Sequence, residues 1–363
     1  MKTLRIAQVA PPYEAVPPHR YGGTERVVSY LTEALVARGH DVTLFATGDS
    51  TTSARLVPIA DRPLRENCTL EELKSLSVPT MLDVVGKVLR HADKFDIIHW
   101  HIDFFPWAFT PLIDAPGVTT MHGRLDLPFL PAVFNQHPNT AVVSISDHQR
   151  TPLAHIQPNW VGTVYNSVPV KDFPFSATPG DYFLFLGRIN TDKRPDWAIE
   201  IAKRTGIPLK IAAKVDPYDQ DYYESEIQPL FDHPLVEFVG EVNEEEKREL
   251  LVNARALLFP IDWPEPFGMV QIEAMACGTP VLAMRRGAVP EVVEHGVTGL
   301  IGDSLEDLIA LAPQLEQMDR RVVRQVAEHR FSAETMAKGY ETIYRQLIAK
   351  VERPLVQKLQ MVS

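Results

Sequence analysis

Two carboxylates, Glu265 and Glu273, lie eight residues apart in the stretch E-P-F-G-M-V-Q-I-E. An apolar run at 256–261 predicts a strand before the first glutamate, and apolar spacing over 269–277 predicts a helix around the second. The junction ends in Gly268, where free backbone N–H groups at a helix N-terminus suit a diphosphate. A carboxylate in the first turns of that helix can accept hydrogen bonds from ribose hydroxyls. The stretch therefore predicts a nucleotide-sugar site, with Glu265 facing the sugar.

This stretch resembles the hallmark of the retaining glycosyltransferases of family 4, which is E-x7-E in the context E-P-F-G-x-x-x-x-E-A-M-A-x-G-x-P-V. The resemblance implies the GT-B fold, an α/β fold with two doubly wound, Rossmann-like domains facing across a cleft. It also implies transfer of a hexose from an NDP-sugar to an acceptor hydroxyl with retention of configuration. Glu265 is then catalytic, Glu273 binds the nucleotide, and Gly268, Met269 and Val270 hold the donor. A surface loop with two solvated acids is the alternative.

Two cations follow an expected strand at 182–186, Arg188 soon after it and Lys193 five residues later. Such a pair suits a diphosphate, because positive charge offsets the negative charge that develops as a glycosidic bond breaks. The family pattern places an Arg and a Lys at this spacing, which implies catalytic and donor-binding roles for both residues. Solvated surface cations are the alternative.

The first half of the chain contains weaker candidates. Gly22 and Gly23 lie between the first expected strand and its helix, where their backbone could approach the donor diphosphate. His122 ends an expected strand at 118–122, and the resemblance implies that it contacts hydroxyls of the donor sugar and orients the reacting centre. A simple turn and a histidine packed at a strand end are the alternatives.

Two patterns resemble metal sites, but we do not expect either of them to bind a metal ion. His99, His101 and Asp103 form H-x-H-x-D at a strand end, but nothing nearby completes a ligand set, so acceptor contact or loop packing is expected. Asp219 and Asp221 form D-x-D at the start of a helical stretch, where Asp is a favoured cap. The resembling family neutralises its diphosphate with Arg and Lys. We therefore expect a metal-independent enzyme whose only small molecules are the nucleotide-sugar donor and an acceptor.

Strand and helix patterns alternate in two series, which is typical of parallel sheets covered on both faces. A stretch with proline and glycine but no periodicity, 166–180, separates the series and predicts a linker. We expect an acceptor-binding domain at 1–167 and a nucleotide-sugar-binding domain at 168–331. The resemblance adds a C-terminal helix at 332–363 that crosses back to the first domain.

Composition restricts the partners. The 363 residues include 36 Lys and Arg against 47 Asp and Glu, a net charge of -11, and neither half is basic, so nucleic acid is not expected. The chain has two cysteines and no apolar run near the roughly 20 residues of a membrane span. The first residues resemble a strand more than a signal peptide, which predicts a soluble, cytoplasmic protein without membrane association.

Several properties stay open at this point. UDP is the default nucleotide, with GDP and ADP as alternatives, and the acceptor could be a carbohydrate, a lipid-linked molecule or a small molecule. The oligomeric state is not indicated. The same architecture also suits a sugar-nucleotide hydrolase, epimerase or phosphorylase, and a non-catalytic sugar-nucleotide-binding protein is a further alternative.

Overall fold

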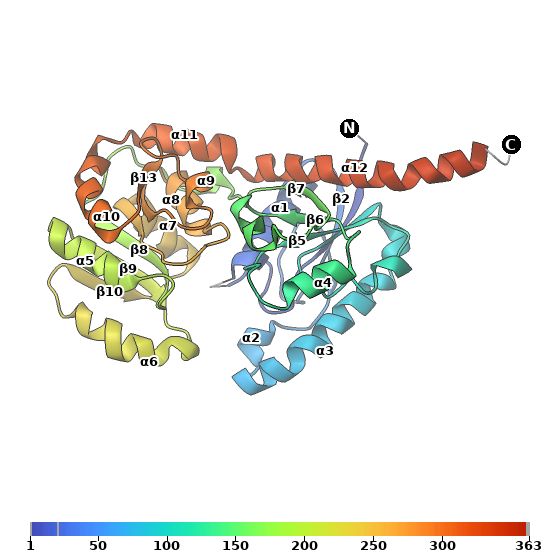
Figure 1. Ribbon diagram of the computed structural model, residues 1–363, viewed down its shortest axis with the longest axis horizontal. Helices are drawn as coiled ribbons and strands as arrows, with labels where there is room; N and C mark the ends of the chain where they lie inside the picture. Colours follow the sequence, from blue (N-terminus) through green and yellow to red (C-terminus); the bar gives the residue numbers. More distant parts are fainter. Residues whose placement is uncertain (1, 20–21, 361–363) are drawn as a thin grey trace. The chain divides into compact units, whose positions relative to one another are not determined.

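The computed structural model describes residues 2–19 and 22–360, with side chains described as far as Val351. The chain forms two compact units (Figure 1). Unit 1 contains Met1–Asn166 and Ala333–Ser363, and unit 2 contains Ser167–Ser332. The unit boundaries lie one residue from the expected domain boundaries. None of the described helices is long and apolar enough to cross a membrane.

Unit 1 is built on a parallel sheet with the strand order β3-β2-β1-β4-β5-β6-β7. The strands are β1 (Arg5–Val9), β2 (Asp41–Ala46), β3 (Arg55–Pro58), β4 (Ile97–Trp100), β5 (Gly117–Met121), β6 (Val142–Ser144) and β7 (Trp160–Thr163). The helices are α1 (Gly23–Ala37), α2 (Leu64–Asn67), α3 (Leu70–Leu89), α4 (Leu130–Gln136) and α12 (Ala333–Gln360). The strand order reverses between β1 and β4, so the switch point of this sheet lies between these two strands.

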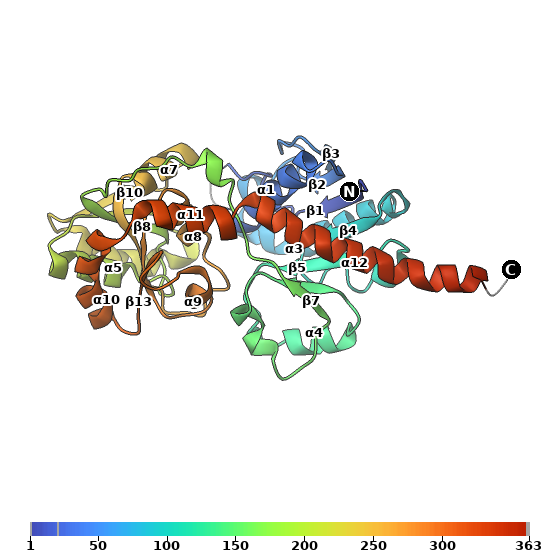
Figure 2. The same cartoon turned by 90° about the horizontal axis from the view of Figure 1, so that it is seen from above.

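The C-terminal helix α12 belongs to unit 1, where it packs on α1 and runs across the unit (Figure 2). Tyr340 and Tyr344 are fully buried, which places one face of the helix in the unit 1 core. Glu341 fixes the helix further, because its carboxylate accepts a hydrogen bond from Nη2 of Arg38 at 2.5 Å and one from Nη2 of Arg345 at 2.7 Å.

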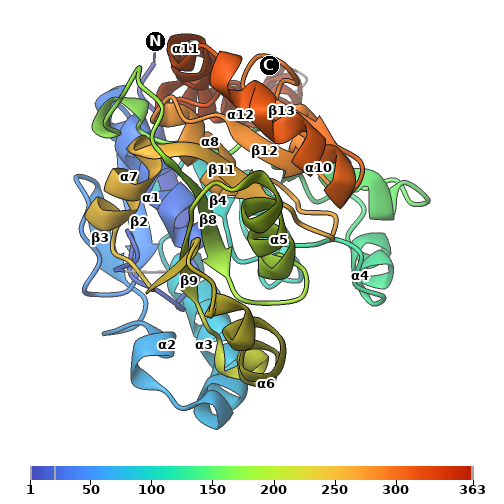
Figure 3. The ribbon, with the colours of Figure 1, turned by 90° about the vertical axis from the view of Figure 1, so that its left-hand side faces the viewer.

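Unit 2 is built on a second parallel sheet with the order β10-β9-β8-β11-β12-β13. The strands are β8 (Tyr182–Arg188), β9 (Leu209–Lys214), β10 (Val236–Gly240), β11 (Ala254–Phe259), β12 (Val281–Met284) and β13 (Gly299–Gly302). The helices are α5 (Pro195–Thr205), α6 (Gln220–Tyr222), α7 (Glu244–Val252), α8 (Met269–Ala276), α9 (Val289–Val292), α10 (Leu305–Leu311) and α11 (Arg320–Arg330). Figure 3 shows α5 and α10 on one side of these strands and α7 and α8 on the other.

Both units are parallel sheets with helical crossovers, which confirms the predicted class of two doubly wound α/β domains. The core strands of unit 2 are almost wholly apolar, and their side chains pack against α5 and α10 in one buried cluster. Strands that are buried on both faces need such continuous apolar runs. The sheets can therefore hold loops at their carboxyl ends in fixed positions.

Candidate functional site

The switch point of the unit 2 sheet brings together two predicted site residues. The strand order reverses between β8 and β11, and open α/β sheets bind ligands beyond the carboxyl ends of their strands at such a point. Lys193 comes from the loop after β8, and Glu265 comes from the loop after β11. Nζ of Lys193 forms an ion pair with Oε2 of Glu265, and the two side chains are only 16% and 13% exposed. A cation and a carboxylate are thus paired at the place where the sheet topology favours a ligand.

The loop that carries Glu265 is held by side-chain and backbone contacts. Trp263 donates its indole N–H to Oε2 of Glu265 at 3.1 Å, and its ring lies under the Lys193 ammonium, with Nζ 5.1 Å from the centroid. The backbone N–H of Ala288 donates to the Glu265 carbonyl oxygen at 2.9 Å. Gly287 has a φ of 55°, and a Cβ atom there would lie 2.3 Å from that oxygen. Only glycine allows this close approach, so the loop after β12 fixes the position of the carboxylate.

Helix α8 begins at the end of the same loop. Gly268 precedes it with a φ of 80°, and a Cβ atom there would lie 2.5 Å from Nε2 of Gln271 and 2.9 Å from the Phe259 ring. The first backbone N–H groups of a helix have no intrahelical acceptor, and at α8 these belong to Met269 and Val270. Such N–H groups can bind an anion, as the sequence predicted for the donor diphosphate.

Glu273 lies on α8 but does not contact Glu265. Its side chain is buried, and Oε1 accepts a hydrogen bond from Nζ of Lys247 on α7 at 2.7 Å. The same ammonium lies 2.7 Å from Oε1 of Glu244. Lys247 was not predicted from the sequence, because it stands in the charged run E-E-E-K-R-E. A signal existed, since Lys247 lies one helical turn before the buried Leu251 and shares its face.

Arg188 is the last residue of β8 and therefore lies at the same sheet edge as the Lys193 loop. Its charge acts on Asp219, the first acid of the D-x-D pattern. Burial raises the pKa of Asp219, and the charge of Arg188 partly offsets this effect. The D-x-D acid thus lies within electrostatic reach of a cation of the candidate site.

The two glycines at the start of α1 in unit 1 have different environments. A Cβ atom on Gly22 would lie 2.7 Å from Cβ of Pro18, so tight packing requires a glycine there. A Cβ atom on Gly23, the first residue of α1, would meet no atom of the described chain within 4 Å. Packing therefore accounts for Gly22, whereas no described atom crowds Gly23.

His122 follows β5 and contacts a second histidine that follows β4. Its Nε2 atom lies 2.8 Å from Nδ1 of His101, and the two rings are 5.1 Å apart. Burial lowers the pKa of His122 to about 4, and burial also lowers the pKa of His101 well below its ordinary value. Both imidazoles are therefore neutral at pH 7. His99 is buried beside them with its own hydrogen bonds, so the H-x-H pattern packs inside unit 1.

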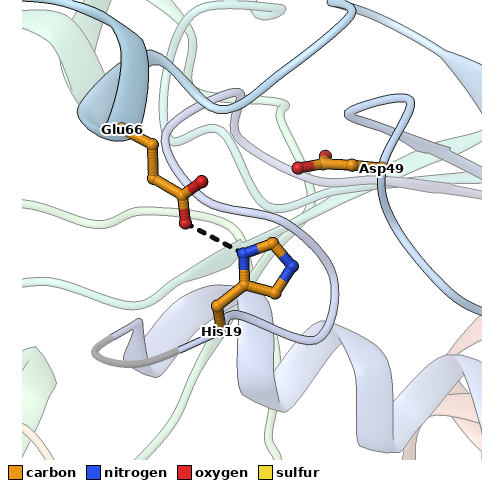
Figure 4. A group of neighbouring side chains, drawn as sticks. All are labelled: His19, Asp49 and Glu66. Atoms are coloured by element: carbon orange, nitrogen blue, oxygen red, sulfur yellow. Dashed lines mark hydrogen bonds and ion pairs between the residues drawn. The ribbon is translucent and has the colours of Figure 1, made fainter.

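Among the described residues, one group of three side chains could hold a metal ion: His19, Asp49 and Glu66, whose ligand atoms lie within 4.8 Å of one another (Figure 4). They follow β1, β2 and β3 in turn, so the sheet edge gathers residues that are distant in sequence. Nδ1 of His19 lies 2.9 Å from Oε1 of Glu66, and these side chains are 55% and 41% exposed. The sequence did not reveal this group, because no local motif joins the three residues.

Two family models together match most of the chain. Residues 171–323 match the model described as Glycosyl transferases group 1, and residues 21–171 match the model described as Glycosyltransferase Family 4. The glycogen synthase of Mycobacterium tuberculosis is 24% identical in sequence, and the match covers 94% of this chain and 94% of that protein.

Solved structures share the fold of the whole chain. Sucrose-phosphate synthase from Thermosynechococcus elongatus superposes with a TM-score of 0.75 at 22% identity, covering 96% of this chain and 100% of that one. HepE of Anabaena, in complex with UDP and glucose, gives a TM-score of 0.71 at 17% identity, covering 95% and 100%. At these identities the structural similarity establishes the fold alone.

Proposed function

This chain belongs to the group 1 glycosyltransferases of the GT-B fold, and from that premise we propose that it transfers a hexose from a nucleoside-diphosphate sugar to an acceptor hydroxyl. The transfer retains the anomeric configuration and needs no metal ion. UDP is the favoured nucleotide, and the HepE complex with UDP and glucose supports this choice.

The observation that carries the proposal is the ion pair between Lys193 and Glu265 at the unit 2 switch point. Both charges are held in a largely buried position, where electrostatic interactions are stronger than in water. The Lys193 ammonium, with Arg188 at the same strand end, offsets the charge of a departing diphosphate. Glu265 contacts hydroxyls of the donor sugar.

In the transition state of this reaction, the transferred glycosyl group has oxocarbenium character. The acceptor hydroxyl attacks from the face that the phosphate leaves, and the leaving phosphate takes its proton. Lys193 has two roles in this scheme. Before the donor binds, its ammonium is neutralised by Glu265, so no uncompensated charge is buried. With the donor bound, the diphosphate provides further negative charge beside the same ammonium, and that charge grows as the glycosidic bond breaks.

The nucleotide is held on α8. The diphosphate binds at the N–H groups of Gly268, Met269 and Val270, where the helix dipole favours an anion. Oε2 of Glu273 accepts hydrogen bonds from the ribose hydroxyls, since this oxygen has no hydrogen-bond partner among the described residues. Oε1 accepts a hydrogen bond from Lys247. The donor contacts of His122 and Gly23 in unit 1 stay predictions from the sequence.

The test is a screen of UDP-, GDP- and ADP-sugars by thermal shift and by release of the nucleoside diphosphate, with and without EDTA. One nucleotide should raise the melting temperature by several degrees, because binding to the folded state alone stabilises it. Glu265→Gln should lower turnover by about 100-fold while the nucleotide still binds. Arg188→Ala and Glu273→Ala should weaken nucleotide binding.

The matched control is Arg204→Ala, which removes an exposed cation that pairs with Glu306 on the surface of unit 2. This variant should behave as the wild type. NMR spectra of the sugar product give its anomeric configuration directly. No stabilisation by any of the three nucleotides, or an inverted product, would contradict the proposal.

A further inference from the structure

A chain of buried polar groups connects His122 to helix α12. Oε1 of Gln8 lies 2.8 Å from Nε2 of His101, and Nδ1 of His101 lies 2.8 Å from Nε2 of His122. On its other side, Nε2 of Gln8 donates to the hydroxyl of Tyr344 at 3.0 Å. Gln8 and Tyr344 are fully buried and His101 is almost so. Gln8 stands on β1 and His101 follows β4, so this series of hydrogen bonds crosses the switch point of the unit 1 sheet.

The Tyr344 hydroxyl continues the chain away from His122. It lies 2.7 Å from Nδ1 of His99, whose Nε2 lies 2.7 Å from the hydroxyl of Thr120. The Thr120 hydroxyl lies 2.8 Å from that of Tyr340, where the chain ends. Buried polar groups without partners are costly, so each member constrains the hydrogen positions of the next.

The direction of these bonds follows from the carboxamide of Gln8. A carboxamide oxygen only accepts hydrogen bonds, so Nε2 of His101 must carry the proton. A neutral imidazole has one N–H, and therefore Nδ1 of His101 is an acceptor that requires an N–H at Nε2 of His122. The remaining nitrogen of His122, Nδ1, then carries a lone pair. Among the described residues this nitrogen has no hydrogen-bond partner.

We propose that Gln8, acting through His101, is a positioning residue that holds His122 as the Nε2–H tautomer and so presents Nδ1 as an acceptor for a hydroxyl of the donor sugar. This inference rests on the proposed function for the identity of the ligand, but the tautomer itself is a property of the free protein. An acceptor nitrogen selects a sugar that offers a hydroxyl at that place, because an analogue without the hydroxyl would leave buried polar groups unpaired.

The three histidines in this series of hydrogen bonds are neutral, as the bond directions require. Burial lowers the pKa of His122 to about 4, and the pKa values of His99 and His101 are lowered well below the ordinary value by burial and by the neighbouring imidazoles. Rotation of the Gln8 carboxamide by 180° would reverse every donor in the chain and give His122 an Nδ1–H. The orientation of one amide thus decides which hydrogen bond His122 offers to a ligand.

The test is the tautomeric state of His122, read from the nitrogen shifts and two-bond proton–nitrogen couplings of histidine-labelled protein without any donor. The His122 signals are assigned by their loss in His122→Gln. We expect the Nε2–H tautomer in the wild type. Gln8→Met keeps the length of the side chain but has no acceptor oxygen, and a mixture of tautomers is expected.

Tyr340→Phe is the matched control, because it removes a hydroxyl from the far end of the same buried chain. It should leave the His122 tautomer unchanged. An Nδ1–H tautomer in the wild type would overturn the inference even if Gln8→Met failed to fold, and so would an unchanged tautomer in folded Gln8→Met. With an active donor, Gln8→Met should also lower kcat/KM about tenfold, the effect of one lost hydrogen bond.

Discussion

Replacement of Lys247 by Met tests how strongly a buried charge pair supports the proposed nucleotide site. Nζ of Lys247 lies 2.7 Å from Oε1 of Glu273 and 2.7 Å from Oε1 of Glu244. Methionine keeps an unbranched, apolar chain but removes the ammonium. Only 3% of the Glu273 side chain is exposed, so the variant would leave a buried carboxylate beside a second one.

The expected loss is several kcal/mol. Two unit charges 2.7 Å apart attract by roughly 6 kcal/mol at an effective dielectric constant of about 20, and desolvation offsets part of this gain. Removal of one partner from a buried pair costs about 3–5 kcal/mol. We expect Lys247→Met to lower the free energy of unfolding of unit 2 by about 3 kcal/mol. Adding Glu273→Gln should recover about half of that loss, since one buried charge is then removed.

The assay is urea unfolding monitored by hydrogen exchange of the amides in α7 and α8. Both helices belong to unit 2, so the measurement reports on that unit alone. Lys210→Met is the control, because the ion pair of Lys210 with Glu237 is 32% and 62% exposed, and such surface pairs contribute less than about 1 kcal/mol. A loss of stability in Lys247→Met no larger than in this control would contradict a stabilising role for the buried pair. So would a double variant less stable than Lys247→Met.

Three further changes have defined outcomes. Burial alone would raise the pKa of Glu341, but hydrogen bonds from Arg345 and Arg38 lower it to about 2, below the ordinary 4.5. Its stabilisation is therefore complete above pH 4.5 and lost toward pH 2, so Glu341→Gln should be less stable by up to roughly 3 kcal/mol at pH 7, with the difference vanishing in acid. Stepped-pH urea unfolding checks this, and a pH-independent difference would contradict it. Gly287→Ala should lower kcat/KM about 100-fold and also lower the melting temperature, because the new Cβ atom meets backbone atoms and the displaced loop misplaces the candidate carboxylate; activity near that of the wild type would contradict it. EDTA should not change the rate of the wild type or of His19→Ala, and a rate that falls with EDTA only in the wild type would assign a metal to the group at β1 to β3.

Local signals predicted much of the fold because the strands are short, apolar and separated by helical patterns. The sequence did not predict β3 or β13, and the reason is physical. β3 is an edge strand of four residues with no buried side chain, and β13 is a four-residue strand that begins and ends with glycine. Neither has the apolar alternation or length by which a strand is recognised.

The candidate site was predictable where a motif and a loop coincide. Glu265 and Gly268 stand in one stretch, and the steric need for Gly268 follows from the turn into α8. The contacts of Lys247 with Glu273 and of His101 with His122 were not predicted, because each joins residues from separate elements of the chain. Gln8 contributes to the His122 contact from a different strand, and a single polar residue within the run I-A-Q-V-A was the only local sign of it.

The two sheets hold their polar groups by opposite electrostatic means. At the unit 2 switch point, Lys193 and Glu265 form an ion pair, so attraction between opposite charges holds the arrangement. At the unit 1 switch point, Gln8 and His101 form a neutral chain, and burial keeps it neutral because the pKa of His122 is only about 4. A proton added to His101 would convert its acceptor nitrogen into a donor and break the bond to His122. The unit 1 arrangement therefore requires imidazoles of low basicity, whereas the unit 2 arrangement relies on the attraction between a cation and a carboxylate.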